Sequence, residues 1–214
     1  MKPYEVARLD ELETLPVDDE GMLWLPVRRT LGVEAFGVNA WTAADAGDRV
    51  IERHREPDGP EELYVVLAGR ATFTVAGETL DAPAGTFVFV PPGTERGAVA
   101  AEPDTTVLAV GAKRGEAFSP SAWEEWVLAD GLRRAGRVDE GREQLRATIE
   151  SRPDSWHPSY NAACFEALAG DRDAALEHLR RAVAAGGEEA RKAAVDDPDF
   201  ASLRDDPRFE EALA

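Results

Sequence analysis

The stretch VIERHREPDGPEELYVVLAG, residues 50–69, decides the fold, because it joins a polar segment to a strand and a turn. Its second half is rich in β-branched and aromatic residues and ends at Gly69, a pattern typical of a β-strand followed by a tight turn. Its first half carries a single histidine, His54, among acidic residues. A site for a first-row transition metal favours several imidazoles. The stretch therefore predicts a strand and raises the question of whether a metal binds beside it.

Similar strand patterns extend on both sides of this stretch, from Met22 to about Ala112. The run RATFTVAG, residues 70–77, alternates almost strictly, which places Ala71, Phe73 and Val75 on one face of a half-buried antiparallel strand. Many short strands separated by Gly and Pro are typical of a sandwich or barrel. This half of the chain is therefore predicted to be all-β.

The pattern changes after residues 113–121, where the chain becomes rich in Ala, Leu, Arg and Glu. These residues are strong helix formers, and Ser119 or Ser121 is predicted to cap the first helix. A shift of 34 residues superimposes Gly136 on Gly170 and Ala129 on Ala163. That period is typical of tetratricopeptide repeats, in which helix pairs stack on one another. We predict two domains, residues 1–116 and residues 117–214.

The helical half also predicts its own core. The small residues expected where helices cross are Ala129, Ala163 and Ala182. The apolar residues expected along the seam are Leu128, Leu145, Ala175 and Leu179. The acidic ending is expected to form a terminal cap with Phe200, Leu203 and Phe209. The chain's lone cysteine, Cys164, is interpreted as buried packing.

Composition excludes several classes of function. The formal net charge of −18 disfavours nucleic acid and anionic membranes as partners, because both require clustered Lys and Arg. One cysteine allows no intramolecular disulfide. The sequence has no apolar leader and no apolar run of the roughly 18 residues that a membrane span needs. We expect a cytoplasmic protein.

Two motifs in residues 47–100 resemble those of the cupin superfamily of jelly-roll barrels. In the first, Glu62 and Gly69 have the family's spacing and Gly47 lies upstream, whereas Glu56 stands where a second histidine would follow His54. In the second motif the structural residues Gly85, Pro91 and Gly93 match the family's pattern. The ligand positions do not match, because Arg96 and Ala100 stand there. The resemblance implies an all-β cupin jelly-roll barrel, joined to an all-α tetratricopeptide-like domain. The whole chain resembles a bacterial class that combines these two parts.

The resemblance also implies where a metal would bind. The family's positions hold His54, Glu56, Glu62 and Arg96 here, and an arginine cannot be a ligand because it has no acceptor atom. We expect no cofactor, and a divalent transition metal on His54, Glu56 and Glu62 is the alternative.

We predict instead that the Arg96 guanidinium replaces the ion by holding Glu62, and also Glu56, through bidentate hydrogen bonds. Alternation in IERHRE, residues 51–56, places Glu52, His54 and Glu56 on one face. The predicted barrel pocket comprises Glu52, His54, Glu56, Glu62, Tyr64 and Arg96.

Three functions are compatible with these patterns, and no catalytic residue is assigned. The first is a non-catalytic protein that binds a small ligand or acts as a scaffold, with the helical repeats taking a protein or peptide partner. The second is a metal-dependent isomerase or dioxygenase that uses His54, Glu56 and Glu62. The third is a sensor whose ligand alters the repeats. A homodimer is expected by analogy, with MLWLPV, residues 22–27, covering or exchanging a sheet edge.

Overall fold

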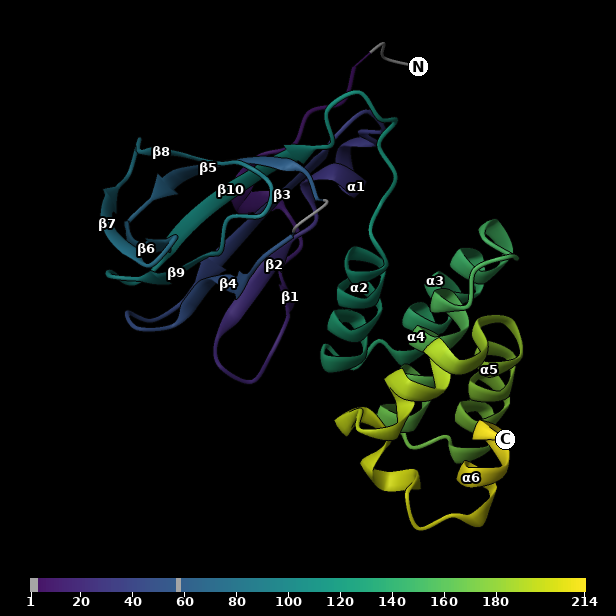
Figure 1. The fold of residues 1–214 in the computed structure, drawn as a ribbon. Helices are drawn as coiled ribbons and strands as arrows, with labels where there is room; N and C mark the ends of the chain where they lie inside the picture. The colour runs from purple at the N-terminus through teal and green to yellow at the C-terminus, as the bar shows by residue number, and fades with distance from the viewer. Residues whose placement is uncertain (1–3, 57–58) are drawn as a thin grey trace. The chain divides into compact units, whose positions relative to one another are not determined.

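The computed structural model describes residues 4–56 and 59–214, which divide into two compact units at Pro120 and Ser121 (Figure 1). The first unit consists mainly of strands and the second consists of helices. Within the described ranges, no helix is both long enough and apolar enough to cross a membrane.

Two antiparallel sheets form the first unit (Figure 1). The larger sheet has the strand order β1 (Leu15–Pro16), β2 (Met22–Leu25), β3 (Gly37–Ala43), β10 (Thr105–Ala112), β5 (Glu61–Ala68) and β8 (Phe87–Val90). The smaller sheet has the order β4 (Arg49–His54), β9 (Arg96–Ala100), β6 (Arg70–Val75) and β7 (Glu78–Pro83). Two short helices, η1 (Leu9–Glu11) and α1 (Val27–Leu31), complete this unit.

Side-chain alternation places the core between the two sheets, as the sequence predicted for β6. Ala71 and Phe73 are both fully buried, and the Phe73 ring lies 5.7 Å from the Tyr64 ring on β5. At another level of the same core, Trp24 and Trp41 pack with ring centroids 6.2 Å apart. Large aromatic side chains therefore fill much of the space between the sheets.

The turn between β5 and β6 depends on Gly69. Its φ of +67° is a left-handed conformation, and a Cβ placed there would lie 2.9 Å from the Cα of Thr105. A side chain at this position would therefore be both strained and in collision with backbone. The sequence motif that ends in Gly69 is explained by this close approach.

The segment MLWLPV covers a sheet edge, one of the two roles expected for it, and it does so within its own chain. Its strand, β2, lies inside the larger sheet, paired with β1 on one side and with β3 on the other. Trp24 in its centre is completely buried. The segment covers the edge of β3 within its own chain, so the free edge of this sheet at the far end belongs to β8.

The second unit contains α2 (Ala122–Arg134), α3 (Val138–Ser151), α4 (His157–Ala169), α5 (Arg172–Val195), η2 (Pro198–Leu203) and α6 (Pro207–Leu213). Of the two serines predicted as the cap, Ser121 caps α2, and its hydroxyl accepts a hydrogen bond from the Glu124 amide at 3.1 Å. Gly136 and Gly170 have φ of +77° and +86°, the left-handed conformation expected where the first helix of each pair ends. Gly187 interrupts α5 with non-helical backbone angles.

The core of this unit confirms the predicted packing. The three small residues predicted at helix crossings, Ala129, Ala163 and Ala182, are fully buried. The predicted seam and terminal cap are also buried: Leu128, Leu145, Ala175, Leu179, Phe200, Leu203, Phe209. Close helix crossings explain the small residues, because a larger side chain would separate the helices.

Candidate barrel site

Four predicted pocket residues meet between the two sheets of the first unit. Glu62 and Tyr64 lie two positions apart on β5, so both side chains point to the same face of the larger sheet. His54 at the end of β4 is the cross-strand partner of Arg96 at the start of β9 in the smaller sheet. The site is thus built by residues from both sheets.

Arg96 is the centre of this group, with only 1% of its surface exposed. Its Nη2 donates to Oε2 of Glu62, its Nε donates to the Tyr64 hydroxyl at 3.3 Å, and its Nη1 donates to the carbonyl of Thr94 at 3.2 Å. The Tyr64 hydroxyl in turn donates to the same Glu62 oxygen at 2.6 Å. We call Glu62, Tyr64 and Arg96 the arginine network.

His54 borders the arginine network. Its Nε2 lies 3.8 Å from Oε2 of Glu62, and its Nδ1 lies 2.7 Å from the backbone carbonyl of Glu52. The carbonyl can only accept, so Nδ1 carries a proton. The Glu62 carboxylate raises the pKa of His54 above 6.5, and partial burial and the Arg96 charge oppose that rise.

The same contacts set the charge states of the other members. Burial would raise the pKa of Glu62, but the hydrogen bonds from His54, Tyr64 and Arg96 outweigh burial and lower it. Burial, with Glu62 adding to it, raises the pKa of Tyr64 far above its ordinary value. Glu62 is therefore an anion and Tyr64 a neutral phenol, and Arg96 balances the buried charge.

Two predicted pocket residues do not join the group. Glu52 is exposed, which corrects the prediction that its side chain lines the pocket. The physical reason is that the pairing of β4 with β9 shifts register on both sides of Ile51, so simple alternation fails in this strand. Only the backbone carbonyl of Glu52 reaches the site, through His54.

Glu56 is half-buried beyond the end of β4, where its backbone carbonyl accepts hydrogen bonds from the amides of Gly59 and Gly93. Its carboxylate lies against Gly59, since a Cβ added there would be 2.3 Å from a Glu56 carboxylate oxygen. The hydrogen bonds found among residues 4–56 and 59–214 join Arg96 to Glu62 and not to Glu56, which corrects the predicted bidentate clamp on both acids.

The donor atoms at this site do not fit a first-row transition-metal site, which favours several imidazoles. His54 is the one imidazole in the group, and Oε2 of Glu62 already accepts hydrogen bonds from Arg96 and Tyr64. The buried guanidinium would also repel a divalent cation by several kcal/mol, at an effective dielectric constant of about 20. The arginine network therefore places a buried positive side chain among the residues at the motif positions.

One contact in the site was not predicted from the sequence. The carbonyl of Thr94 accepts a hydrogen bond from Arg96, in the turn that follows Pro91 and Gly93. A backbone acceptor leaves no signal in residue type, so only the folded turn reveals it. The Pro and Gly of the motif were the available hint, because they predict a tight turn beside Arg96.

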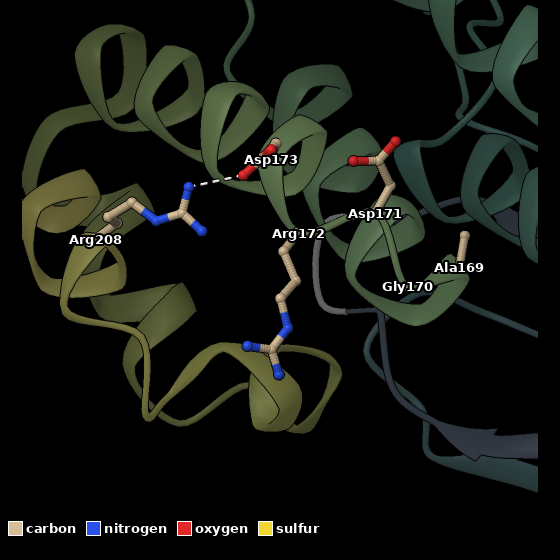
Figure 2. A pocket seen from close by; sticks show the side chains of 6 residues that line it. All are labelled: Ala169, Gly170, Asp171, Arg172, Asp173 and Arg208. Atoms are coloured by element: carbon tan, nitrogen blue, oxygen red, sulfur yellow. Dashed lines mark hydrogen bonds and ion pairs between the residues drawn. The ribbon is translucent and has the colours of Figure 1, made fainter.

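Surface hollows lie on the second unit, and two of them are described by their linings. Figure 2 shows one, which is shallow and lies beside the start of α5, where Arg208 donates to Asp173 at 2.7 Å and both side chains are largely exposed. The other hollow, of about 390 Å³, is lined by α3, α4 and α5. Leu145, Ile149 and Ala162 supply its apolar lining, and its polar lining consists of Arg142, Arg146, Glu150, Glu166, His178 and Arg181. We call this second hollow the arginine groove.

Cys164 lies near Asp197 and Asp199, and ligand atoms of the three residues are all within 4.8 Å of one another. Cys164 is 3% exposed, and burial raises the pKa of its thiol far above the ordinary value, so it is a neutral thiol. Asp197 accepts hydrogen bonds from the Tyr160 hydroxyl at 2.6 Å and from the Asp199 amide at 3.0 Å. The group is accounted for by the cap of η2 and by packing.

Comparison with known proteins identifies the first unit. Residues 41–111 match the family model described as "Cupin domain". An uncharacterised protein from Streptomyces coelicolor is 32% identical over 87 residues, which is 40% of this chain and 74% of that protein.

Solved structures are also similar. KdgF from a Halomonas species is 21% identical, with a TM-score of 0.43, and the match covers 50% of this chain and 93% of that chain. A sugar phosphate isomerase of the cupin superfamily from Silicibacter pomeroyi is 19% identical, with a TM-score of 0.46, over 51% of this chain and 76% of that chain.

Proposed function

The chain belongs to the cupin superfamily through its first unit, and from that premise we propose that it is a non-catalytic binding protein. In this proposal the barrel binds a small ligand or acts as a scaffold, and the helical unit provides a protein-interaction surface. The observation that carries the proposal is the burial of Arg96 on Glu62, at positions where the family's sequence motifs place metal ligands.

The arginine network satisfies its own hydrogen-bonding groups. Glu62 receives hydrogen bonds from Arg96 and Tyr64, and Arg96 uses all of its nitrogen positions within the first unit. A metal would have to displace a buried cation and break these bonds, which costs more free energy than two remaining donors, His54 and Glu62, would return. A carboxylate that is already paired is a poor catalytic base as well.

Metal binding tests the barrel part of the proposal. We expect the purified full chain to bind no stoichiometric Mn²⁺, Fe²⁺ or Zn²⁺ in calorimetric titrations. The variant Arg96→His, which returns an imidazole to the motif position and removes the cation, should gain affinity for at least one of these ions.

The matched control is Glu56→Gln, which should bind metal no differently from the wild type because the Glu56 carboxylate lies against Gly59. Stoichiometric transition metal in the wild type that is lost in both His54→Ala and Glu56→Gln would overturn the proposal and favour an enzyme with His54, Glu56 and Glu62 as ligands.

The helical unit is proposed to be a tetratricopeptide-like array. Support comes from the repeat of 34 residues, which relates Gly136 to Gly170 in sequence and places both in the left-handed conformation after a helix. The same interval relates the start of α3 at Val138 to the start of α5 at Arg172. Arrays of this kind present grooves to other proteins.

The arginine groove is the surface that we assign to the partner. Arg142 forms a two-point contact with the Glu166 carboxylate, with Nε to Oε1 at 2.9 Å and Nη2 to Oε2 at 2.7 Å. Arg146 and Arg181 are exposed at the rim, and the lining includes the buried Leu145. Because the chain as a whole has a net charge of −18, a rim with exposed guanidinium groups favours an acidic amphipathic segment at this place.

A labelled helical peptide with leucines on one face and glutamates on the other is the probe. We expect micromolar binding that weakens with added salt, and a loss of at least tenfold in affinity for Arg146→Glu with Arg181→Glu. Arg180→Glu is the control, because Arg180 is exposed on the same helix but does not line the groove. Equal loss in the control would contradict the assignment to this groove.

A further inference from the structure

His178 of α5 lines the arginine groove, and its two ring nitrogens have different surroundings. The ring as a whole is half-buried, but Nδ1 is fully buried and has no hydrogen-bond partner in the part of the chain that the structure describes. A buried polar atom without a partner is uncommon in folded proteins and needs an explanation. Because Nδ1 is out of reach, an occupant of the groove can contact this ring only through Nε2.

The buried Nδ1 sets the charge state of the ring. In the neutral imidazole one nitrogen carries the proton, and Nε2 is the better place for it, because an N–H at Nδ1 would be a buried donor without an acceptor. The charged ring carries a proton on both nitrogens, so it needs the unfavourable N–H as well. Burial and the charge of Arg181 lower the pKa of His178 in the same sense. In the chain by itself His178 is therefore neutral at pH 7.

The acidic side chains near His178 are already paired. The two acids whose charges favour a charged ring are Glu166 and Glu177. Glu166 accepts two hydrogen bonds from Arg142, and Glu177 accepts one from Arg181. A charged imidazole would therefore need its countercharge from outside the chain. The charged side chains around the ring come from three helices, namely α3 with Arg142, Arg146 and Glu150, α4 with Glu166, and α5 with Glu177 and Arg181.

We propose that the arginine groove takes up a proton at His178 when it binds its acidic segment, and that Nε2 of His178 then donates to a carboxylate of that segment. This inference rests on the proposed function, because the acidic segment is the partner assigned to the groove. A carboxylate against Nε2 supplies the countercharge that the chain lacks, and a charge-assisted hydrogen bond favours the charged ring.

The sign of the pH dependence follows from linkage between proton and segment. The pKa of His178 lies below 6.5 in the chain by itself, and a bound carboxylate raises it. Whatever raises the affinity of the ring for a proton is itself bound more tightly when the proton is present. The affinity for the segment is therefore constant in alkaline solution and increases as the pH falls through the two pKa values. The groove holds its partner most tightly in mildly acidic solution.

Titration of the full chain with the labelled peptide of leucines and glutamates tests the proposal between pH 5.5 and pH 8. The glutamates of the peptide stay ionised throughout, because their ordinary pKa is about 4.3. We expect the affinity to be about fivefold higher at pH 5.5 than at pH 8. Calorimetry at pH 6.5 in two buffers with different ionisation enthalpies counts the protons, and we expect an uptake of about half a proton per peptide bound.

Two variants assign the proton to one residue. His178→Gln keeps a neutral polar side chain, and it should bind the peptide about equally at both pH values and take up no proton. His157→Gln is the matched control, because His157 is an exposed histidine at the start of α4 that does not line the groove. It should keep the pH dependence and the proton uptake of the wild type.

The outcomes separate this inference from the assignment of the groove. Peptide binding that requires Arg146 and Arg181 but takes up no proton overturns the inference alone. Proton uptake that persists in His178→Gln also overturns it, since another group then titrates. Absence of peptide binding at both pH values overturns the groove assignment and the inference together. Proton uptake is measured on the wild type, so a poorly folded His178→Gln does not prevent a decision.

Discussion

Two arginine–glutamate pairs, one in each unit, have the same chemistry and very different surroundings. In the first unit, the side chains of Arg96 and Glu62 are 1% and 16% exposed, and one carboxylate oxygen takes the contact. In the second unit, the side chains of Arg142 and Glu166 are 34% and 8% exposed, and both carboxylate oxygens are used. The Arg142–Glu166 pair has the two-point geometry, and its arginine is more exposed to water than Arg96.

This difference shows that the burial of each arginine–glutamate pair decides how much stability its unit loses when the pair is broken. If Arg96 is removed, Glu62 and Tyr64 lose the buried guanidinium that bonds to both, and solvent has little access to replace it. If Arg142 is removed, water can replace part of what Glu166 loses. Breaking a buried pair costs about 3–5 kcal/mol, whereas an exposed pair contributes up to about 1 kcal/mol.

The largest effect is expected for Arg96→Ala. We predict that it lowers the free energy of unfolding of the first unit by about 3–5 kcal/mol, because the Glu62 carboxylate is stranded. Chemical denaturation followed by tryptophan fluorescence measures this, since Trp24 and Trp41 lie in that core. Arg53→Ala is the control, because Arg53 lies on β4, the strand beside that of Arg96, and its contact with Glu95 is exposed.

A double substitution sharpens the same point. Replacement of both Arg96 and Glu62 by methionine should recover most of the stability that Arg96→Ala loses, because no buried charge is left unpaired. A double variant that is as unstable as Arg96→Ala would mean that packing around the guanidinium stem, rather than charge, accounts for the loss.

A smaller effect is expected for Arg142→Ala in the helical unit. We predict a loss of about 1–2 kcal/mol, between the values for exposed and buried pairs, because Glu166 is buried while Arg142 is partly in water. Thermal melting followed by circular dichroism at 222 nm measures it. A loss as large as that of Arg96→Ala would remove the distinction between the two pairs.

The smallest effects are expected from two histidines, and they have opposite signs. The pKa of His54 is raised above 6.5, chiefly by its contact with Glu62, so its stabilising contribution is fully present below pH 6.5 and is lost as the pH rises through the folded-state value. The pKa of His178 is lowered by burial and by Arg181, so folding is unaffected well above pH 6.5 and is penalised as the pH falls below it.

Denaturation of His54→Gln and His178→Gln between pH 5 and 9 checks both signs. Relative to the wild type, His54→Gln should be least stable at the acidic end, and His178→Gln should gain stability there. The same trend in both variants would contradict the contacts assigned to one of the two histidines.

Local patterns predicted most of the secondary structure, because each depends on a few adjacent residues. Alternation in β6, the cap at Ser121 and the left-handed turns at Gly136 and Gly170 are features of this kind. β4 is different, since two register shifts against β9 turn Glu52 outward. Such shifts depend on how two strands fit together, and the residues of one strand do not reveal them.

The contacts of the arginine network also divide into those that the sequence predicted and those that only the structure shows. Residue types at the motif positions already indicated that Arg96 stands where the family has a histidine, with Glu62 and Glu56 as its expected partners. The structure adds that Tyr64 bridges the two, that Thr94 accepts through its backbone, and that Glu56 lies against Gly59. The contacts of Arg96 with Tyr64 and with Glu62 join residues 32 and 34 positions apart in the chain, and only the packing of two sheets brings these residues within hydrogen-bond distance.

The sequence by itself determined the strand and helix periods, the repeat of 34 residues and the charge type of each motif position. Only the tertiary structure decided which acid pairs with Arg96, and that Phe87 and Phe89 are left uncovered while Val88 and Val90 are buried. The physical reason is that propensity and periodicity act over a few neighbouring residues. Burial and pairing depend on which distant segments meet, and that is settled when the chain packs.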